Sequence, residues 1–248
     1  MELPWDKICI INLKQHKKRL ESTLNQLHRE NLIGNKCVEA VYGYDFVPYG
    51  KQIKKEKNRS KKNTFLKSMR KGLEKNKILK RTKYRPLRIG EIGCNMSFIN
   101  TFKKALDNGF EKVLVLEDDC KLTTDFLKKV NNVLKFVPNN WDVLYLGIND
   151  INKKWGSFKK INKYINKPLG SRKLPDKRYI ESEGAIYGNH GFIINRKAME
   201  LFIEHNLPMT YPADVILGKL ATQYKLIHSY SLSKQLITTF NAGSNTQL

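Results

Sequence analysis

The sequence predicts an α/β fold with a mainly parallel central sheet and helices on both faces of that sheet. Short apolar runs typical of buried strands occur at residues 8–13 and 112–117, and segments with apolar residues at helical spacing follow them. This alternation indicates right-handed crossovers between parallel strands. Because 248 residues are enough for one sizeable core, we expect a single domain over residues 1–248.

The first half of the chain predicts two strands and two helices around a basic insertion. Residues 37–41 form a second short strand, which Gly43 ends. Residues 51–88 form the insertion, rich in Lys, Asn, Arg and Ser, part of which is expected to be a basic helix and the rest a solvated loop. The helices are marked by Leu20, Leu24 and Leu27 in the first, Phe65, Met69 and Leu73 in the insertion, and Ile92, Met96 and Ile99 in the third, which Gly109 ends.

The second half predicts three further strands and three helices. A helix capped by residues 123–125 follows the strand at 112–117, and another strand covers residues 141–147. Residues 148–184 form a long connection, for which we expect a lid or binding loop. A strand at 191–194 leads into a helix that Asn195 caps, and Pro212 with Asp214 opens the last helix.

The chain is strongly basic, with 46 Lys and Arg against 23 Asp and Glu and a formal net charge of +23. Such a charge favours polyanionic partners, namely nucleic acid, anionic lipid or the pyrophosphate of a nucleotide sugar. A compositional bias toward Lys, Asn and Ile explains it equally well without any function. Nucleic-acid binding is the less favoured reading, because helix-turn-helix, zinc-module and RNA-recognition signatures are absent from the sequence.

The remaining bulk features predict a cytoplasmic protein that associates at most peripherally with anionic surfaces. The sequence has no apolar run long enough to span a bilayer and no recognisable secretory signal. Its four cysteines are scattered without CxxC pairs, so neither a zinc site nor a disulfide framework is indicated.

Three consecutive acids, Glu117, Asp118 and Asp119, follow the most clearly apolar strand. Like charges at the end of a buried strand repel one another and lose hydration, so a divalent cation, Mn²⁺ or Mg²⁺, is expected to neutralise them. Alternation along the strand places Glu117 and Asp119 on one side as metal ligands and turns Asp118 elsewhere, toward a donor sugar. The alternative is that the acids begin a turn and cap the next helix.

The sequence resembles glycosyltransferase family 25, which includes lipooligosaccharide sugar transferases and collagen hydroxylysine galactosyltransferases. The similarity rests on five blocks in the same order, which together span most of the chain outside the basic insertion and the long connection. They are Ile11-Asn12-Leu13 with Arg19, Gly90-Glu91-Ile92-Gly93-Cys94 with Ser97, Leu114-Val115-Leu116-Glu117-Asp118-Asp119, Gly188-Asn189-His190-Gly191-Phe192 with Arg196, and Tyr211-Pro212-Ala213-Asp214.

The resemblance implies a GT-A type fold, a nucleotide-sugar donor that is usually a uridine diphosphate sugar, and transfer with inversion. It also implies roles by position: Glu117 and Asp119 on the metal, and a donor site made by Asn12, Leu13, Arg19, Glu91, Ser97, Asp118 and His190. The chain departs from the family pattern at three places, with Gln15 where Arg is common, Tyr42 where Asp is common and Phe98 where His is common.

Two site residues have competing interpretations. Asp214 is our candidate for the base that takes the proton of the acceptor hydroxyl, and the alternative is plain helix capping. His190 is a candidate metal or phosphate contact, and the alternative is a hydrogen-bonded core histidine.

The function predicted from the sequence is transfer of a sugar onto a hydroxyl of a glycan or of a hydroxylysine-bearing protein. The alternatives are an inactive relative that binds glycan or protein, and a nucleic-acid-binding protein. The sequence leaves the donor sugar, the acceptor and the oligomeric state open.

Overall fold

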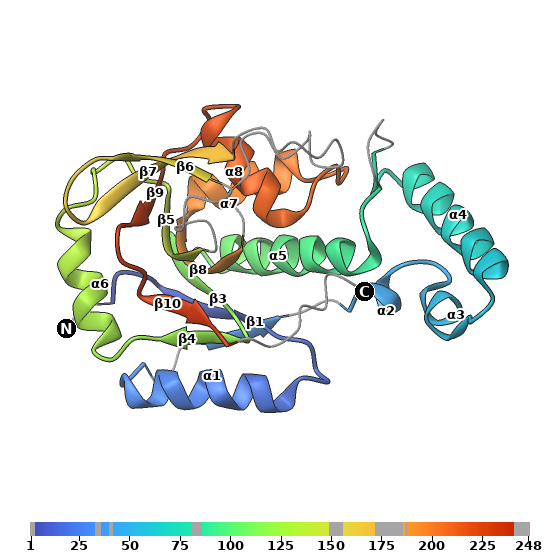
Figure 1. The fold of residues 1–248 in the computed structure, drawn as a ribbon, viewed down its shortest axis with the longest axis horizontal. Coiled ribbons are helices and arrows are strands. Elements are labelled where there is room, and N and C mark those ends of the chain that lie inside the picture. The colour runs from blue at the N-terminus through green and yellow to red at the C-terminus, as the bar shows by residue number, and fades with distance from the viewer. Residues whose placement is uncertain are drawn as a thin grey trace.

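The computed structural model describes residues 3–32, 36–39, 42–80, 86–148, 156–171, 186 and 188–240 (Figure 1). The strands are β1 (Lys7–Ile11), β2 (Lys36–Glu39), β3 (Lys112–Glu117), β4 (Cys120–Leu122), β5 (Val143–Ile148), β6 (Gly156–Lys160), β7 (Ile165–Ser171), β8 (Asn189–Asn195), β9 (Ser229–Leu232) and β10 (Ile237–Thr239). The helices are α1 (Lys17–Arg29), α2 (Gly43–Phe46), α3 (Gly50–Lys55), α4 (Arg59–Lys75), α5 (Ile89–Asp107), α6 (Phe126–Leu134), α7 (Arg196–His205) and α8 (Ala213–Thr222).

The main sheet has eight strands in the order β2-β1-β3-β8-β5-β9-β7-β6. β1 is parallel to β2 and β3, and β5 is parallel to β9. β8 lies antiparallel between β3 and β5, and β7 is antiparallel to its two neighbours. The strands other than β8 and β7 therefore point the same way, which confirms the predicted mainly parallel sheet.

Helices cover both faces of the sheet, as predicted (Figure 1). Successive residues of β3 enter two separate cores, because side chains alternate across a strand. Val113 and Val115 pack in the core that contains residues of α5 and α7, whereas Leu114 and Leu116 pack in the core that contains residues of α1 and α6. A strand buried on both sides needs an almost uninterrupted apolar run, and this requirement explains the sequence of β3.

The two predicted helix caps have opposite outcomes. Asn195 caps α7 as expected, since its side chain accepts a hydrogen bond from the backbone N–H of Ala198 at 3.0 Å. The local cap predicted for α6 is wrong: Asp125 precedes the helix with a φ of 54° and makes no capping hydrogen bond. The carboxylate of Glu30, at the end of α1, instead accepts from the N–H of Phe126 at 2.6 Å.

The basic insertion is more helical than predicted. α3 and α4 occupy residues 50–75, and Asn58 caps α4 by accepting hydrogen bonds from the N–H groups of Ser60 and Lys61. Met69 and Leu73 anchor α4 in the core, which confirms the helical spacing read from the sequence. Within the long connection, β6 and β7 form a hairpin at the edge of the sheet, and residues 149–155 and 172–184 lie outside the described residues.

No helix in the described part of the chain is both long enough and apolar enough to cross a bilayer.

Candidate active site

The three consecutive acids form a loop at the carboxyl end of β3, where that strand lies beside β1. Ile11 pairs with Glu117 in the parallel register, so the first acid is level with the end of β1. β4 follows the loop and pairs with β10. The N–H of Phe240, just after β10, donates to the carbonyl oxygen of Asp119 at 2.9 Å. The acid loop is therefore held from two sides, by the main sheet and by the two-stranded sheet.

Asp118 is buried, and its carboxylate is bound by groups from the β1–α1 region. Asn12 Nδ2 donates to it at 2.7 Å, and an Arg19 guanidinium nitrogen lies 3.2 Å from its other oxygen. The Thr23 hydroxyl donates to the carbonyl oxygen of Asp118 at 3.0 Å. Asn12 and Arg19 thus hold the acid loop in place, while a direct contact of Asn12, Arg19 or Asp118 with the donor stays a prediction.

Replacing Asn12 with alanine is expected to destabilise the fold by roughly 1.5–3 kcal/mol, because a buried carboxylate would lose a charge-assisted hydrogen bond. The Asn12 amide also donates to the carbonyl oxygen of His16 at 3.2 Å, so the turn into α1 would lose a second contact. Chemical denaturation measures the change. Gln15→Ala is the control, because Gln15 is an exposed residue in the same turn, and it is expected to change the free energy of unfolding little.

Asp119 and Glu117, the two predicted metal ligands, are electrostatically coupled. Burial raises the pKa of Asp119, and the negative charge of Glu117 raises it further, while the nearby Arg19 lowers it. Asp119 Oδ1 is buried and has no hydrogen-bond partner. The Glu117 side chain is 35% exposed, and its Oε2 lies 3.4 Å from His190 Nδ1 on β8.

The donor set fits a hard divalent cation, because two neighbouring carboxylates leave a buried oxygen without a partner. Among the described residues there is no group of three or more His, Cys, Asp or Glu side chains arranged to hold a metal. Two carboxylates suffice for an ion whose other ligands are water and phosphate oxygens, which is how Mg²⁺ commonly binds at nucleotide sites.

Asp214 lies in the first turn of α8, close enough to Glu117 of the acid loop for the charge of that residue to affect it. Its carboxylate accepts hydrogen bonds from the N–H of Gly188 at 3.3 Å and the N–H of Val215 at 2.9 Å. Burial raises the pKa of Asp214 to about 6; these two bonds oppose the shift, and Glu117 and Glu91 add to it. Pro212 occupies the N-cap position of α8 and no side chain caps the helix there, so Asp214 is not the N-cap residue, although it binds an N–H of the first turn.

One acid from a third element, Glu91 of α5, lies close enough to Glu117 and Asp214 for all three charges to act on one thiol. Burial raises the pKa of the Cys94 thiol, and the charges of Glu117, Asp214 and Glu91 raise it further. Glu91 also accepts a hydrogen bond from the N–H of Arg88 at 2.7 Å, which fixes it at the start of α5. Carboxylates from β3, α5 and α8 therefore converge in a chain whose net charge is +23.

Gly43 permits the packing that places the start of α5. A Cβ atom on this residue would lie 2.1 Å from the backbone oxygen of Ile89, so only glycine allows α2 to approach α5 so closely. The glycine predicted to end a strand thus has a second role, in positioning the helix that carries Glu91.

Three other candidate residues make internal contacts. Ser97 donates from its hydroxyl to the carbonyl oxygen of Gly93 within α5, and the carbonyl of Leu13 accepts from the N–H of His16 in the turn after β1. Phe98 is buried within a cluster of phenylalanines. The Phe98 side chain therefore supports the core beneath the site.

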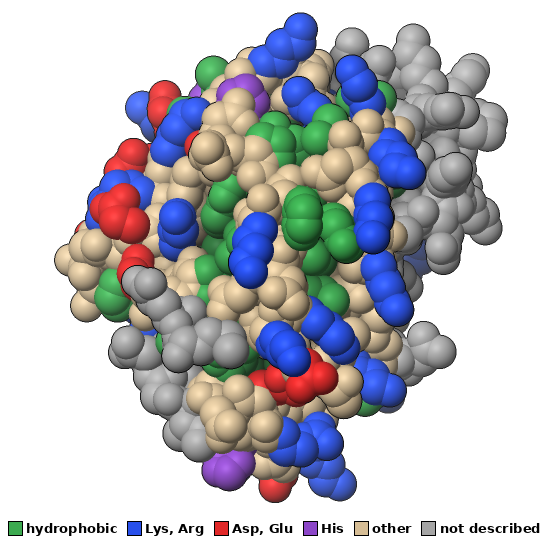
Figure 2. All heavy atoms as spheres, turned by 90° about the vertical axis from the view of Figure 1, so that its left-hand side faces the viewer, with side chains coloured by type: hydrophobic (Ala, Val, Ile, Leu, Met, Phe, Trp, Pro, Cys, Tyr) green, Lys and Arg blue, Asp and Glu red, His purple; other side chains and the backbone are tan. Residues whose placement is uncertain are grey.

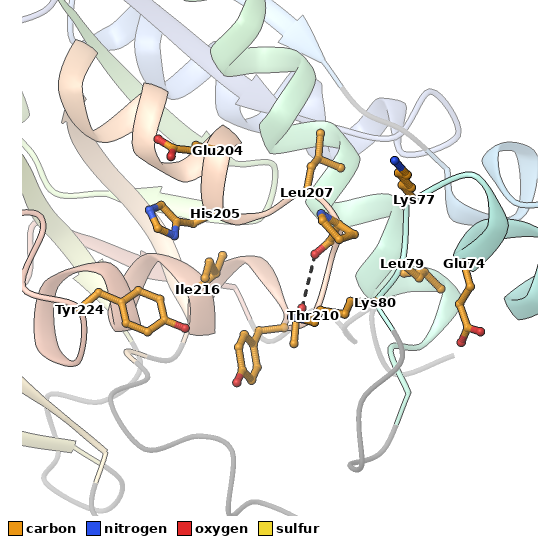
Figure 3. A pocket seen from close by; sticks show the side chains of 12 residues that line it. Glu74, Lys77, Leu79, Lys80, Glu204, His205, Leu207, Thr210, Ile216 and Tyr224 are labelled. Atoms are coloured by element: carbon orange, nitrogen blue, oxygen red, sulfur yellow. Dashed lines mark hydrogen bonds between the residues drawn. The ribbon is translucent and has the colours of Figure 1, made fainter.

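A separate pocket of about 650 Å³ lies between the end of α4, the end of α7 and α8 (Figure 3). Its lining includes Tyr211, Tyr224, His205, Lys77 and Lys80 and none of the predicted site residues. Sequence reasoning missed this pocket because its walls come from segments that are far apart in the chain. Asn95, on the helix α5 that also carries Glu91, contacts the lining of this pocket, since the Asn95 amide donates to the carbonyl oxygen of Tyr211 at 2.9 Å.

Known proteins resemble this chain at the level of a family. Mouse procollagen galactosyltransferase 2 is 31% identical over 151 residues, which are 59% of this chain and 21% of that protein, and the human protein of the same name is 32% identical over the same length. A rat protein described as probable inactive glycosyltransferase 25 family member 3 is 31% identical over 71 residues, 27% of this chain and 12% of its own. The chain thus matches about a fifth or less of the length of these relatives.

Solved structures resemble it only distantly. An apo UDP-glucose pyrophosphorylase aligns over 92% of this chain and 90% of its own, with 13% identity and a TM-score of 0.42. A mannose-1-phosphate geranyltransferase from Thermus thermophilus aligns over 91% of this chain and 72% of its own, with 13% identity and a TM-score of 0.39. Similarity at this level carries no argument about function.

The family model described as glycosyltransferase family 25 (LPS biosynthesis protein) matches residues 5–217. The match runs from the residues before β1 into α8 and so includes each of the converging carboxylates. The chain belongs to glycosyltransferase family 25.

Proposed function

We propose that this protein transfers a sugar from a nucleotide diphosphate sugar, specifically a uridine diphosphate sugar, to a hydroxyl acceptor with inversion. The observation that carries the proposal is the convergence of Glu117, Asp119 and Asp214 at the carboxyl end of β3, where Asp119 keeps one oxygen unpartnered. In open α/β sheets ligands bind at this end of the strands. Family membership supports the same reaction class.

The metal would be Mn²⁺ or Mg²⁺, held by Glu117 and Asp119. When bound, such an ion neutralises the diphosphate as it leaves the donor. Asn12 and Arg19 contribute by fixing Asp118 and with it the backbone of the acid loop. Positioning of this kind matters because two carboxylates would otherwise repel each other out of ligand geometry.

Asp214 is the proposed base. An inverting transfer needs a group that accepts the acceptor hydroxyl proton as the new glycosidic bond forms, and Asp214 is the acid whose pKa is raised to about 6. At neutral pH it is largely ionised, yet it binds a proton more strongly than an ordinary aspartate. The N–H groups of Gly188 and Val215 hold its carboxylate in one orientation.

The proposed acceptor is a glycan or a hydroxylysine-bearing protein. Relatives named procollagen galactosyltransferases support a protein acceptor and a galactose donor, and the family description supports a lipopolysaccharide acceptor. Because the matched segment is about a fifth of those relatives, the acceptor must be established on this chain itself.

A panel of nucleotide sugars, each assayed for Mn²⁺-dependent release of its diphosphate, tests the proposal. One uridine diphosphate sugar is expected to turn over, and chelation of the metal is expected to stop turnover. Binding of the donor without release of diphosphate, with or without acceptor glycans, would instead establish an inactive binding module. Salt-dependent binding of duplex DNA without turnover would establish the nucleic-acid alternative.

A further inference from the structure

One surface of the protein, formed by α6 with the residues that follow it and by the β6–β7 hairpin, combines lysines with exposed apolar side chains. The described stretches 126–148 and 156–171 contain lysines at 128, 129, 135, 159, 160, 163 and 167, and within them Asp142 is the single acid. The hairpin turn and α6 lie together at the left edge of the molecule in Figure 1. Figure 2 looks onto this side and shows a hydrophobic patch with lysine and arginine side chains around it.

We call the lysine face the end of the molecule formed by the hairpin and the segment after α6, which carries Phe136, Ile161 and Tyr164 together with lysines at 135, 159, 160 and 163. Lys159 and Lys160 are adjacent in β6 and project to opposite sides of the hairpin. Phe136 is 45% exposed and Ile161 is 40% exposed, and both rank among the most exposed large apolar side chains of the described residues. All four lysines are exposed. Lys163 also lies over the ring of Tyr164, with its Nζ 5.0 Å from the ring centroid.

Hydrogen bonds hold the apolar part of the lysine face in place. Asn162 Nδ2 donates to the carbonyl oxygen of Phe136 at 2.9 Å and so ties the hairpin turn to the segment after α6. Asn162 Oδ1 accepts from the N–H groups of Tyr164 and Ile165, each at 2.9 Å. The rings of Phe136 and Tyr164 contact each other, with centroids 4.4 Å apart. The exposed apolar groups are therefore presented by a fixed platform.

Asp142 does not neutralise the lysines of this surface. It is 5% exposed, and its carboxylate accepts hydrogen bonds from the Asn195 amide, the N–H of His228 and the Lys197 ammonium. The positive charge of the lysine face is therefore uncompensated within these two stretches.

We infer that the lysine face docks the protein on an anionic lipid surface. Lysines attract acidic headgroups, and apolar side chains among them enter the interfacial layer, which is the combination that binds proteins peripherally to membranes. A nucleic acid fits less well. Single-stranded nucleic acid stacks its bases on open aromatic faces, whereas the rings of Phe136 and Tyr164 pack against each other, and Ile161 offers no stacking surface.

Co-sedimentation with vesicles tests the inference. The intact protein is expected to bind vesicles that contain phosphatidylglycerol, to be released by high salt, and to bind pure phosphatidylcholine vesicles far less. The quadruple variant K135E/K159E/K160E/K163E is expected to lose roughly a hundredfold or more in partition, because each lysine near an anionic surface contributes appreciably to binding. The matched control, K61E/K67E/K71E/K75E on the exposed side of α4, makes the same change in net charge. Its partition onto vesicles is expected to fall by less than about tenfold.

A second variant separates lipid from other polyanions. Replacing Phe136 and Ile161 with serine is expected to reduce vesicle binding about tenfold and to leave binding of duplex DNA unchanged, because only a membrane takes up the apolar side chains. An equal loss of vesicle binding in the lysine-face variant and the α4 control would overturn the inference, as would stronger binding of DNA than of vesicles that depends on the lysine face. Unchanged thermal midpoints show that these variants keep the fold, and vesicle binding is measured without donor, so the outcome is independent of the proposed function.

Discussion

Asp119→Asn is expected to reduce Mn²⁺-dependent release of the donor diphosphate by roughly a thousandfold or more, since a Lewis acid supplies several kcal/mol of stabilisation to a leaving diphosphate. The amide removes one of two metal-binding charges while keeping the size of the side chain. Because Asp119 Oδ1 is buried without a partner and sits beside Glu117, the loss of its charge is expected to leave the thermal midpoint unchanged or higher. A large loss of activity without a loss of stability identifies a residue kept for function.

The matched control for this prediction is Asp125→Asn, an exposed acid shortly after the acid loop whose left-handed backbone conformation asparagine tolerates. It is expected to keep full activity. Isothermal titration with Mn²⁺ in the presence of uridine diphosphate gives the direct measurement. If Asp119→Asn bound the ion as tightly as the parent, the metal site would have to lie elsewhere.

Asp214→Asn is expected to reduce sugar transfer by roughly a hundred- to ten-thousandfold, the range ascribed to general bases, while leaving Mn²⁺ binding intact. The parent enzyme should lose activity as the pH falls through about 6, because the base must be ionised and the raised pKa of Asp214 places its protonation there. The residual activity of the variant should lack this acid limb. A profile with the same limb in both proteins would exclude Asp214 as its source.

The same substitution has a predictable effect on stability. The unfolded chain has the ordinary carboxyl pKa of 3.8, and the folded chain has a pKa of about 6, so the fold favours the protonated form. The contribution of Asp214 to stability is therefore greatest below pH 3.8 and is lost as the pH rises through about 6. At pH 8 the variant should be more stable by about 1–2 kcal/mol. This figure allows for the loss of one of the two backbone hydrogen bonds, because the amide nitrogen of asparagine cannot accept one. Thermal unfolding at pH 8 and at acidic pH measures the difference, which should shrink at acidic pH.

Local patterns in the sequence were enough to predict β1, β2, β3, β5, β8 and the longer helices, whereas the other described strands, β4, β6, β7, β9 and β10, were not predicted. The bounds of β3 are those of the predicted strand, and the acid loop follows directly, because both depend on a continuous apolar run and the charges that end it. The direction of a strand is not encoded in such a run. β8 has a short apolar run of its own, Phe192–Ile194, and lies antiparallel to β3, so the reversed strand at the centre of the sheet could be found only from the structure.

Contacts between distant segments account for what the sequence did not predict. The bond from Asn12 to Asp118 joins residues 106 positions apart, and no pattern within either segment indicates it. The cap of α6 comes from Glu30 on another helix, so a search among the residues before α6 selected the wrong group. Asp214 was a candidate through family resemblance, and its raised pKa, which is caused mainly by burial and increased by the charges of Glu117 and Glu91, depends on the folded structure.

The pairing of β10 with β4 has a consequence for how this protein can be altered. Ile237 is opposite Leu122, and Thr239 is opposite Cys120. The N–H of the next residue, Phe240, donates to the carbonyl oxygen of Asp119. This part of the chain nevertheless lies beyond the segment that matches the family model. Deleting one residue between Leu232 and Leu236 would shift β10 by one position and turn its buried side chain, Ile237, outward. Such a deletion, more than a hundred positions from Asp119 in the chain, is expected to abolish the proposed activity by displacing the Asp119 carboxylate, although the deleted residue does not contact it.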